Sequence, residues 1–134
     1  MPIGLLGPIN SGAAVGSNGA ATANNSSTVQ LWGEVLAIYV KYNDSPPAGT
    51  TDVTVTTVGT SPAPPATTLQ SLPNAATDGW FYPRTQIQTT AGTGLTYDGT
   101  NKVEEPIPVC DYVNVKIDQA NAADNVDVWI LYRC

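Results

Sequence analysis

Apolar and polar residues alternate in short runs along most of this chain, and clusters of turn residues separate the runs. In residues 52–58, Val53 and Val55 alternate with threonines, which indicates a half-exposed strand. Residues 29–42 form a longer candidate strand, and its centre, residues 35–40, is apolar on both faces, as expected of a strand that is covered on both sides. Shorter strand signals follow around Leu69, Trp80, Ile87, Leu95 and Ile107.

The strongest pairing signal lies at the C-terminus, where residues 109–117 and 126–133 flank a polar segment. This pattern predicts a hairpin whose register decides the state of the two cysteines. In one register six aliphatic side chains share a face, and Cys110 and Cys134 point to opposite faces and stay free thiols. A slip of one residue places the cysteines opposite each other, as a disulfide requires. We favour the first register because it gathers the aliphatic residues, and because disulfides are uncommon in the cytosol.

Residues 1–28 differ from the rest of the chain, because glycine, alanine, serine and asparagine dominate and apolar residues are scattered. Such a segment buries too little surface to offset its ordering entropy, so we expect an extended arm that is disordered by itself. We expect a neighbouring subunit or partner to hold the arm, with packing onto its own domain as the alternative. The candidate contact residues of the arm are Ile3, Leu5, Leu6 and Ile9.

Together these patterns predict an all-β protein, in which residues 29–134 form a single antiparallel β-sandwich of the jelly-roll or β-tulip kind, preceded by the extended N-terminal arm. Seven or eight short strands with frequent turns are typical of that class. The length of 134 residues suits one core, and the 12 glycines and 11 prolines favour turns over helices.

The charge balance makes some partners unfavourable. Eleven acidic residues against five basic ones give a formal net charge of −6. This field repels phosphate backbones and anionic lipid headgroups, so we expect neither nucleic acid nor membrane as a partner. The first residues lack the basic and apolar regions of a secretory signal, so we expect synthesis without export.

The side chains offer little for catalysis. The chain has no histidine, which removes the commonest general base and a common metal ligand. Glu104 and Glu105 are adjacent carboxylates, but we interpret them as solvated charge on an edge segment. Asp118, Asn121 and Asp124 could gather a calcium ion in one loop, although their spacing is not that of an EF-hand. We expect no enzyme activity, no metal and no cofactor.

A run of aromatic residues is the most distinctive local feature. Trp80, Phe81 and Tyr82 follow a turn at Asp78 and precede Pro83 and Arg84. Successive strand residues point to opposite faces, so Trp80 and Tyr82 should share one face and Phe81 should take the other. Tryptophan, tyrosine and arginine dominate interface hot spots, so we interpret Asp78, Trp80, Phe81, Tyr82 and Arg84 as interface residues. Packing of both faces inside the sandwich is the alternative.

Four segments, in their order and spacing, resemble the auxiliary head proteins of tailed bacteriophages, also called decoration or cement proteins. These segments are residues 51–57, 77–84, 106–109 and 126–132. The resemblance implies a β-sandwich or β-tulip domain that forms homotrimers on the capsid exterior, binds the major capsid protein, and reaches neighbours with a terminal arm. It also implies assembly in the bacterial host cytoplasm. The two cysteines depart from this family pattern.

The resemblance therefore favours a virion structural protein that decorates and reinforces a capsid. One alternative is another structural position in the head or tail. A second alternative, from a different class, is a β-sandwich module that binds carbohydrate or a cell surface through exposed aromatics such as Trp32 or Trp80.

Overall fold

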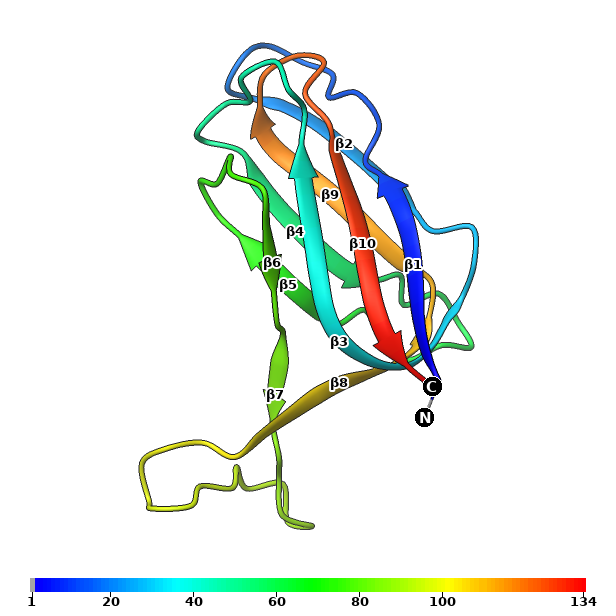
Figure 1. The fold of residues 1–134 in the computed structure, drawn as a ribbon, viewed down its shortest axis with the longest axis vertical. Coiled ribbons are helices and arrows are strands. Elements are labelled where there is room, and N and C mark those ends of the chain that lie inside the picture. Colours follow the sequence, from blue (N-terminus) through cyan, green and yellow to red (C-terminus); the bar gives the residue numbers. More distant parts are fainter. Residues whose placement is uncertain (1) are drawn as a thin grey trace.

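The computed structural model describes residues 2–134 and shows two antiparallel sheets packed face to face, which confirms the predicted β-sandwich (Figure 1). Residues 2–134 contain no helix, and so none that could cross a membrane.

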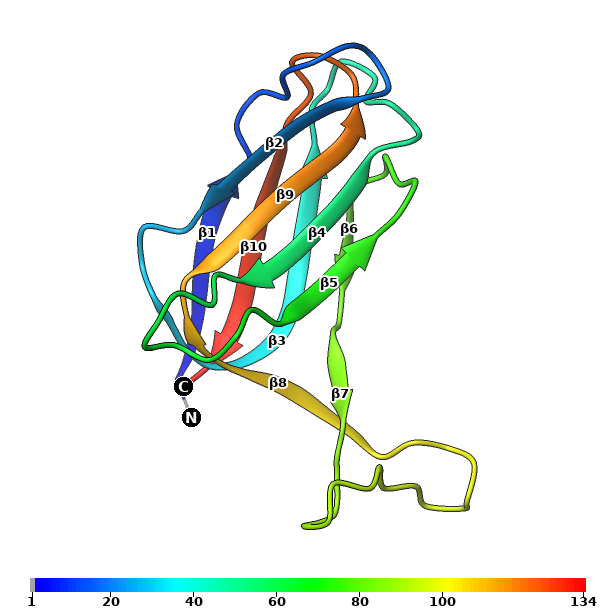
Figure 2. The same cartoon turned by 180° about the vertical axis from the view of Figure 1, so that it is seen from behind.

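The larger sheet has the strand order β1-β10-β3-β8-β7, with β6 paired to β3 beside β8. Its strands are β1 (Ile3–Asn10), β3 (Leu31–Tyr42), β6 (Gly79–Phe81), β7 (Arg84–Gln86), β8 (Glu104–Asp111) and β10 (Val126–Arg133). The smaller sheet has the order β2-β9-β4-β5 and lies in front in Figure 2. Its strands are β2 (Ala21–Ser26), β4 (Asp52–Thr57), β5 (Thr68–Leu72) and β9 (Val113–Ala120).

The core lies between the two sheets and is built from the inward residues of alternating strands. In β4 the predicted alternation holds, because Val53 and Val55 are buried and the intervening threonine is half-exposed. Burying each such side chain stabilises the fold by about 1.5–3 kcal/mol. The largest fully buried side chains are Leu31, Val35, Ile38, Val40, Val53, Val55, Val113, Val115, Ile117, Val126, Val128 and Ile130.

The predicted C-terminal hairpin is wrong, because its two strands lie in opposite sheets. β9 pairs with β2 and β4, whereas β10 pairs with β1 and β3. The six aliphatic residues that motivated the hairpin do meet, but across the sandwich and not side by side. Two strands with one apolar face each bury that face equally well in either arrangement, so alternation alone did not distinguish them.

The cysteines are both free and exposed, and neither proposed hairpin register applies to them. Cys110 on β8 is the register partner of Trp32, and Cys134 follows β10 on the other side of β3, next to Gly33. The width of two strand spacings, about 9–10 Å, thus separates their backbones. A disulfide needs Cα atoms within about 7 Å, so the strand β3 keeps the two thiols apart.

The N-terminal residues do not form a separate arm, and the prediction that only other subunits order them is wrong. β1 pairs with β10 in the larger sheet, and β2 pairs with β9 in the smaller one. Ile9, Ala14 and Ala21 are buried in the core. The small residues permit this: a Cβ on Gly7, whose φ is +129°, would lie 2.7 Å from the carbonyl oxygen of Val128. The structure thus follows the alternative in which the segment packs on its own domain.

A long ribbon projects from the sandwich at the fork between β6 and β8 (Figure 1). Its root is formed by β7 and the first half of β8, and its outer part by residues 87–103. The Asp98-Gly99 turn lies inside a bridge between Thr96 and Lys102, where the sequence indicates a hairpin. The ribbon extends away from both sheets, as the reverse view in Figure 2 also shows.

Candidate interaction surface

The outer faces of the two sheets differ in chemistry. On the smaller sheet, the outward residues of the three adjoining strands β2, β4 and β9 are polar, as a water-facing surface should be: Thr22, Asn24, Asp52, Thr54, Thr56, Asn114, Lys116 and Asp118. On the larger sheet the corresponding positions include several aromatic and aliphatic side chains. The larger sheet therefore presents the more apolar surface to solvent.

A row of side chains crosses four adjacent strands on this outer face. Trp129 of β10 is the register partner of Tyr39 of β3, and Tyr39 is the partner of Trp80 of β6. The ring centroids lie 5.8 Å apart for Tyr39 and Trp129, and 5.1 Å apart for Tyr39 and Trp80. With Leu5 of β1 these rings line a shallow hollow of about 250 Å³. We call Leu5, Trp129, Tyr39 and Trp80 the aromatic row.

The aromatic row is open to water in the isolated chain. Trp80 is 50% exposed and Leu5 is 58% exposed. Tilted rings at these distances stabilise one another by about 0.5–1.5 kcal/mol, but they leave apolar area uncovered. Contiguous exposed apolar surface of this kind is typical of a binding or assembly surface.

Charged groups border the aromatic row along the strands. On one side, Lys41 is the register partner of Asp127, and the amide of Asn10 donates to the Asp127 carboxylate at 2.8 Å. At the opposite end of the β10–β3 pair, the Arg133 guanidinium forms an ion pair with Glu34. An apolar centre with a polar rim is the usual anatomy of a protein interface.

The predicted site residues divide between this face and the interior. Ile3, Leu5 and Trp80 are exposed, and Leu5 and Trp80 meet in the aromatic row. Leu6 and Phe81 are partly buried and pack against the core, and Ile9 is buried in it, so none of these three side chains belongs to the aromatic row. Trp80 and Phe81 thus point in opposite directions, as the alternation predicts, and Tyr82 is exposed just beyond β6.

Asp78 and Arg84 have contacts within the chain. The Asp78 carboxylate accepts a hydrogen bond from the backbone N–H of Tyr42 at 2.8 Å. The guanidinium of Arg84 donates to the carbonyl of Leu36 at 2.9 Å, at the fork where β3 leaves β8 for β6. Arg84 therefore ties the root of the ribbon to the larger sheet. Neither residue is part of the aromatic row.

Tyr39 and Trp129 are the interface candidates that sequence reasoning missed. The alternation in residues 126–130 already assigns Trp129 to the face opposite the buried valines. Its partner could not be identified, because the predicted hairpin paired β10 with the wrong strand. The signal that could have found Tyr39 was the two-sided apolar pattern of residues 35–40, which we took for burial on both sides.

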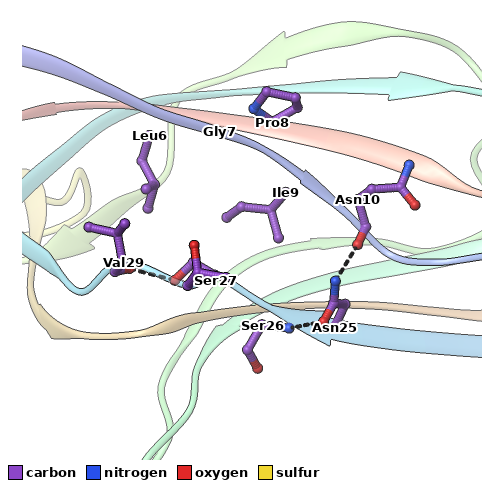
Figure 3. A pocket seen from close by; sticks show the side chains of 10 residues that line it. Leu6, Gly7, Pro8, Ile9, Asn10, Asn25, Ser26, Ser27 and Val29 are labelled. Atoms are coloured by element: carbon purple, nitrogen blue, oxygen red, sulfur yellow. Dashed lines mark hydrogen bonds between the residues drawn. The ribbon is translucent and has the colours of Figure 1, made fainter.

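A second concave site lies between the edge strands β1 and β2, with a volume of about 240 Å³ (Figure 3). Its ten lining residues are Leu6, Gly7, Pro8, Ile9, Asn10, Asn25, Ser26, Ser27, Thr28 and Val29. The amide of Asn25 donates to the carbonyl of Asn10 at 3.0 Å and joins the two edges. The Ser27 hydroxyl donates to the Val29 carbonyl. With no ionisable side chain in its lining, this cavity offers no acid, base or charged anchor.

The carboxylate considered for calcium has a structural use. Asp124 is buried and accepts hydrogen bonds from the amide of Asn43 at 3.1 Å and from the backbone N–H groups of Ala48 and Asn121 at 3.1 and 3.0 Å. It therefore joins the loop between β3 and β4 to the loop between β9 and β10, where the chain crosses between the sheets. Among residues 2–134, no group of three or more acidic or cysteine side chains could hold a metal ion.

Comparison with known proteins adds no family assignment: no protein-family model, no curated protein and no solved structure matches this chain significantly.

Proposed function

We propose that this chain is a virion structural protein that decorates and reinforces a tailed-phage capsid, and that the part of the outer face of its larger sheet around the aromatic row is a subunit interface. The aromatic row on that face is the observation that carries the proposal. The reason for placing that interface on a phage capsid is the resemblance to auxiliary head proteins in residues 51–57, 77–84, 106–109 and 126–132. The partners are then the major capsid protein and further copies of the chain, on the capsid exterior.

The sequence of β3 supports an interface at this face. A central strand that is apolar on both sides is typical of burial on both sides. In the isolated chain the smaller sheet covers the inner side, where Ile38 and Val40 are buried. The outer side, with Tyr39, is covered by no other element of the described chain. A partner on this side would complete the burial that the pattern of β3 predicts.

Binding of carbohydrate is the second candidate, because exposed aromatic rings also serve as platforms for sugars. A sugar site adds a few precisely placed polar groups that fix the orientation of the ligand. The four side chains that line the hollow bring no carboxylate or amide group beside the rings. The row thus suits an apolar protein surface better than a sugar.

Binding of purified protein to capsids that lack it tests the proposal. Trp80→Ala removes the exposed end of the aromatic row, and we expect occupancy on particles to fall at least about tenfold, as for an interface hot spot. Trp32→Ala is the matched control, because Trp32 is also exposed, at 61%, and lies on β3 about 23 Å from Tyr39.

Equal occupancy of wild type, Trp80→Ala and Trp32→Ala would refute the interface. Binding of the wild type to a glycan array, with loss of that binding in Trp80→Ala, would instead support the carbohydrate alternative.

A further inference from the structure

The ribbon is the part of the structure with the least internal support. None of the residues 84–108 is buried, although residues on both sides of this segment are. Ordering a residue costs about 1–2 kcal/mol of backbone entropy, and a two-stranded ribbon with no packed face is marginal in water. A stable position for this ribbon therefore requires a surface against which it can pack.

The outer part of the ribbon carries apolar side chains suited to such packing. Ile87, Leu95 and Val103 come from three segments that hydrogen bonds join: the Ile87 N–H donates to Val103, Leu95 to Ile87, and Val103 to Leu95, at 2.8–3.0 Å. Tyr97 lies beyond them and is 72% exposed. The ribbon therefore presents aliphatic and aromatic groups without a core of its own.

The charges of the ribbon are compatible with those of the aromatic face. The ribbon carries Asp98, Glu104 and Glu105 against two bases, Lys102 and, at its root, Arg84. The outer face of the larger sheet carries Lys41 opposite Asp127, and Arg133 in an ion pair with Glu34. A weakly acidic ribbon therefore meets a face with balanced charges, and docking brings no strong like charges together.

The dimensions also agree. The aromatic row spans three strand spacings, about 14–15 Å, and a two-stranded ribbon with its side chains is about 10 Å wide. The ribbon cannot reach the row of its own chain, because it projects away from the sandwich in both views (Figures 1 and 2). A ribbon that covers the row must therefore come from another molecule.

We propose that the ribbon of one copy of this chain docks on the aromatic row of the next copy. The contact is head-to-tail, since each molecule gives a ribbon and receives one. Contacts of this kind close into a ring when the rotation between successive copies closes, and form an open filament when it does not. Three copies would form the trimer that the phage resemblance implies. The inference rests on the proposed function, because it takes the aromatic row as an interface. It adds that the partner on the row is the ribbon of a second copy of the chain.

Native mass spectrometry of variants tests the proposal. In the first variant an Asn-Gly turn replaces residues 88–102, which removes the tip and leaves the pairing of β7 with β8. In the second, Trp80→Ser breaks the row. We expect the wild type to form a closed ring and each variant alone to be a monomer. A mixture of the two variants should form one-to-one pairs, because one supplies an intact ribbon and the other an intact row. Trp32→Ser should still form rings.

A second ribbon variant, Leu95→Ser with Tyr97→Ser, covers the case in which the shortened chain does not fold. Both side chains are exposed and lie outside the sandwich, so their replacement should not affect folding. Rings formed by this variant or by the shortened chain would overturn the proposal. Monomeric wild type would overturn it too.

The failure of this inference differs from failure of the proposed function. A monomeric wild type whose binding to particles is lost in Trp80→Ala would leave the row as a capsid interface and refute only the ribbon contact. Rings that depend on the ribbon, together with equal particle occupancy for every variant, would support the ribbon contact and refute the capsid interface.

Discussion

At the scale of single residues, Tyr42 carries the clearest electrostatic signature of the fold. Its ring is buried, at 3% exposed, and its hydroxyl has no hydrogen-bond partner within the described residues. Burial, with a smaller contribution from the Asp78 charge, raises the pKa of Tyr42 to about 12. Tyrosine in an unfolded chain titrates near pH 10. The free energy of unfolding is therefore unaffected by this group below about pH 10, and it falls as the pH rises from about 10 toward 12.

Tyr42→Phe should remove this alkaline loss. A shift of about two pKa units corresponds to about 2–3 kcal/mol of unfolding free energy, lost by the wild type above pH 12 but not by the variant. At pH 7 the variant should be as stable as the wild type or up to about 1 kcal/mol more stable, since the deleted hydroxyl is buried and unpaired. Urea unfolding between pH 7 and 12 measures both effects.

Tyr97→Phe is the control, because Tyr97 is exposed. This variant should lose as much unfolding free energy at alkaline pH as the wild type. If Tyr42→Phe lost as much unfolding free energy between about pH 10 and 12 as the wild type, a group other than Tyr42 would cause the loss.

At the scale of elements, the contact of Arg84 with Leu36 fixes where the ribbon leaves the larger sheet. Arg84→Met removes the donor and leaves the Leu36 carbonyl without its partner, at a cost of about 1–2 kcal/mol. Backbone amides of β7 and of Glu104 and Glu105 should then exchange with deuterium about tenfold faster, whereas amides of β4 and β9 should not change. Arg84→Lys, which keeps one donor, should show a smaller effect. Unchanged exchange in Arg84→Met would exclude Arg84 as the residue that positions the ribbon.

Limited proteolysis distinguishes the two segments that lie at the edges of the fold. β1 is hydrogen-bonded to β10 and brings Ile9 into the core, so the free protein should resist cleavage in residues 3–10. The tip, residues 88–102, has no such support, so it should be cut first. Mass spectrometry of the earliest fragments locates the cuts. Initial cleavage within residues 3–10 would contradict the pairing of β1 and restore the extended arm.

The sequence predicts which face of a strand is buried far better than it predicts which strands are neighbours. Alternation in residues 52–58 and 126–133 identified the buried valines and isoleucines correctly. It did not distinguish pairing within a sheet from packing across the sandwich, because both arrangements bury the same side chains. Residues 1–28 were misjudged for a related reason: alanine and glycine give little hydrophobic signal, yet they fit where strands approach closely.

The candidate site was predictable in part. Leu5 and Trp80 were identified as interface residues from composition and from the aromatic run, and both belong to the aromatic row. Tyr39 and Trp129 join them only through the registers of β3 with β6 and β10. Tyr39 is 41 positions from Trp80 and 90 positions from Trp129, so these registers leave no local pattern. Arg84 was singled out for its residue type, but its backbone contact became visible only in the fold.

At the scale of the whole molecule, the central claim is that the aromatic row on the outer face of the larger sheet is covered in the assembled state. Hydroxyl-radical footprinting of the free protein and of intact particles measures this cover directly. We predict that Trp80, Tyr39 and Trp129 lose at least about fivefold in oxidation rate on assembly, as the buried core of an interface should. Tyr112, which is exposed outside both the row and the ribbon, serves as the reference. Oxidation of the row at the same rate in particles as in free protein, with Tyr112 unchanged, would contradict the account.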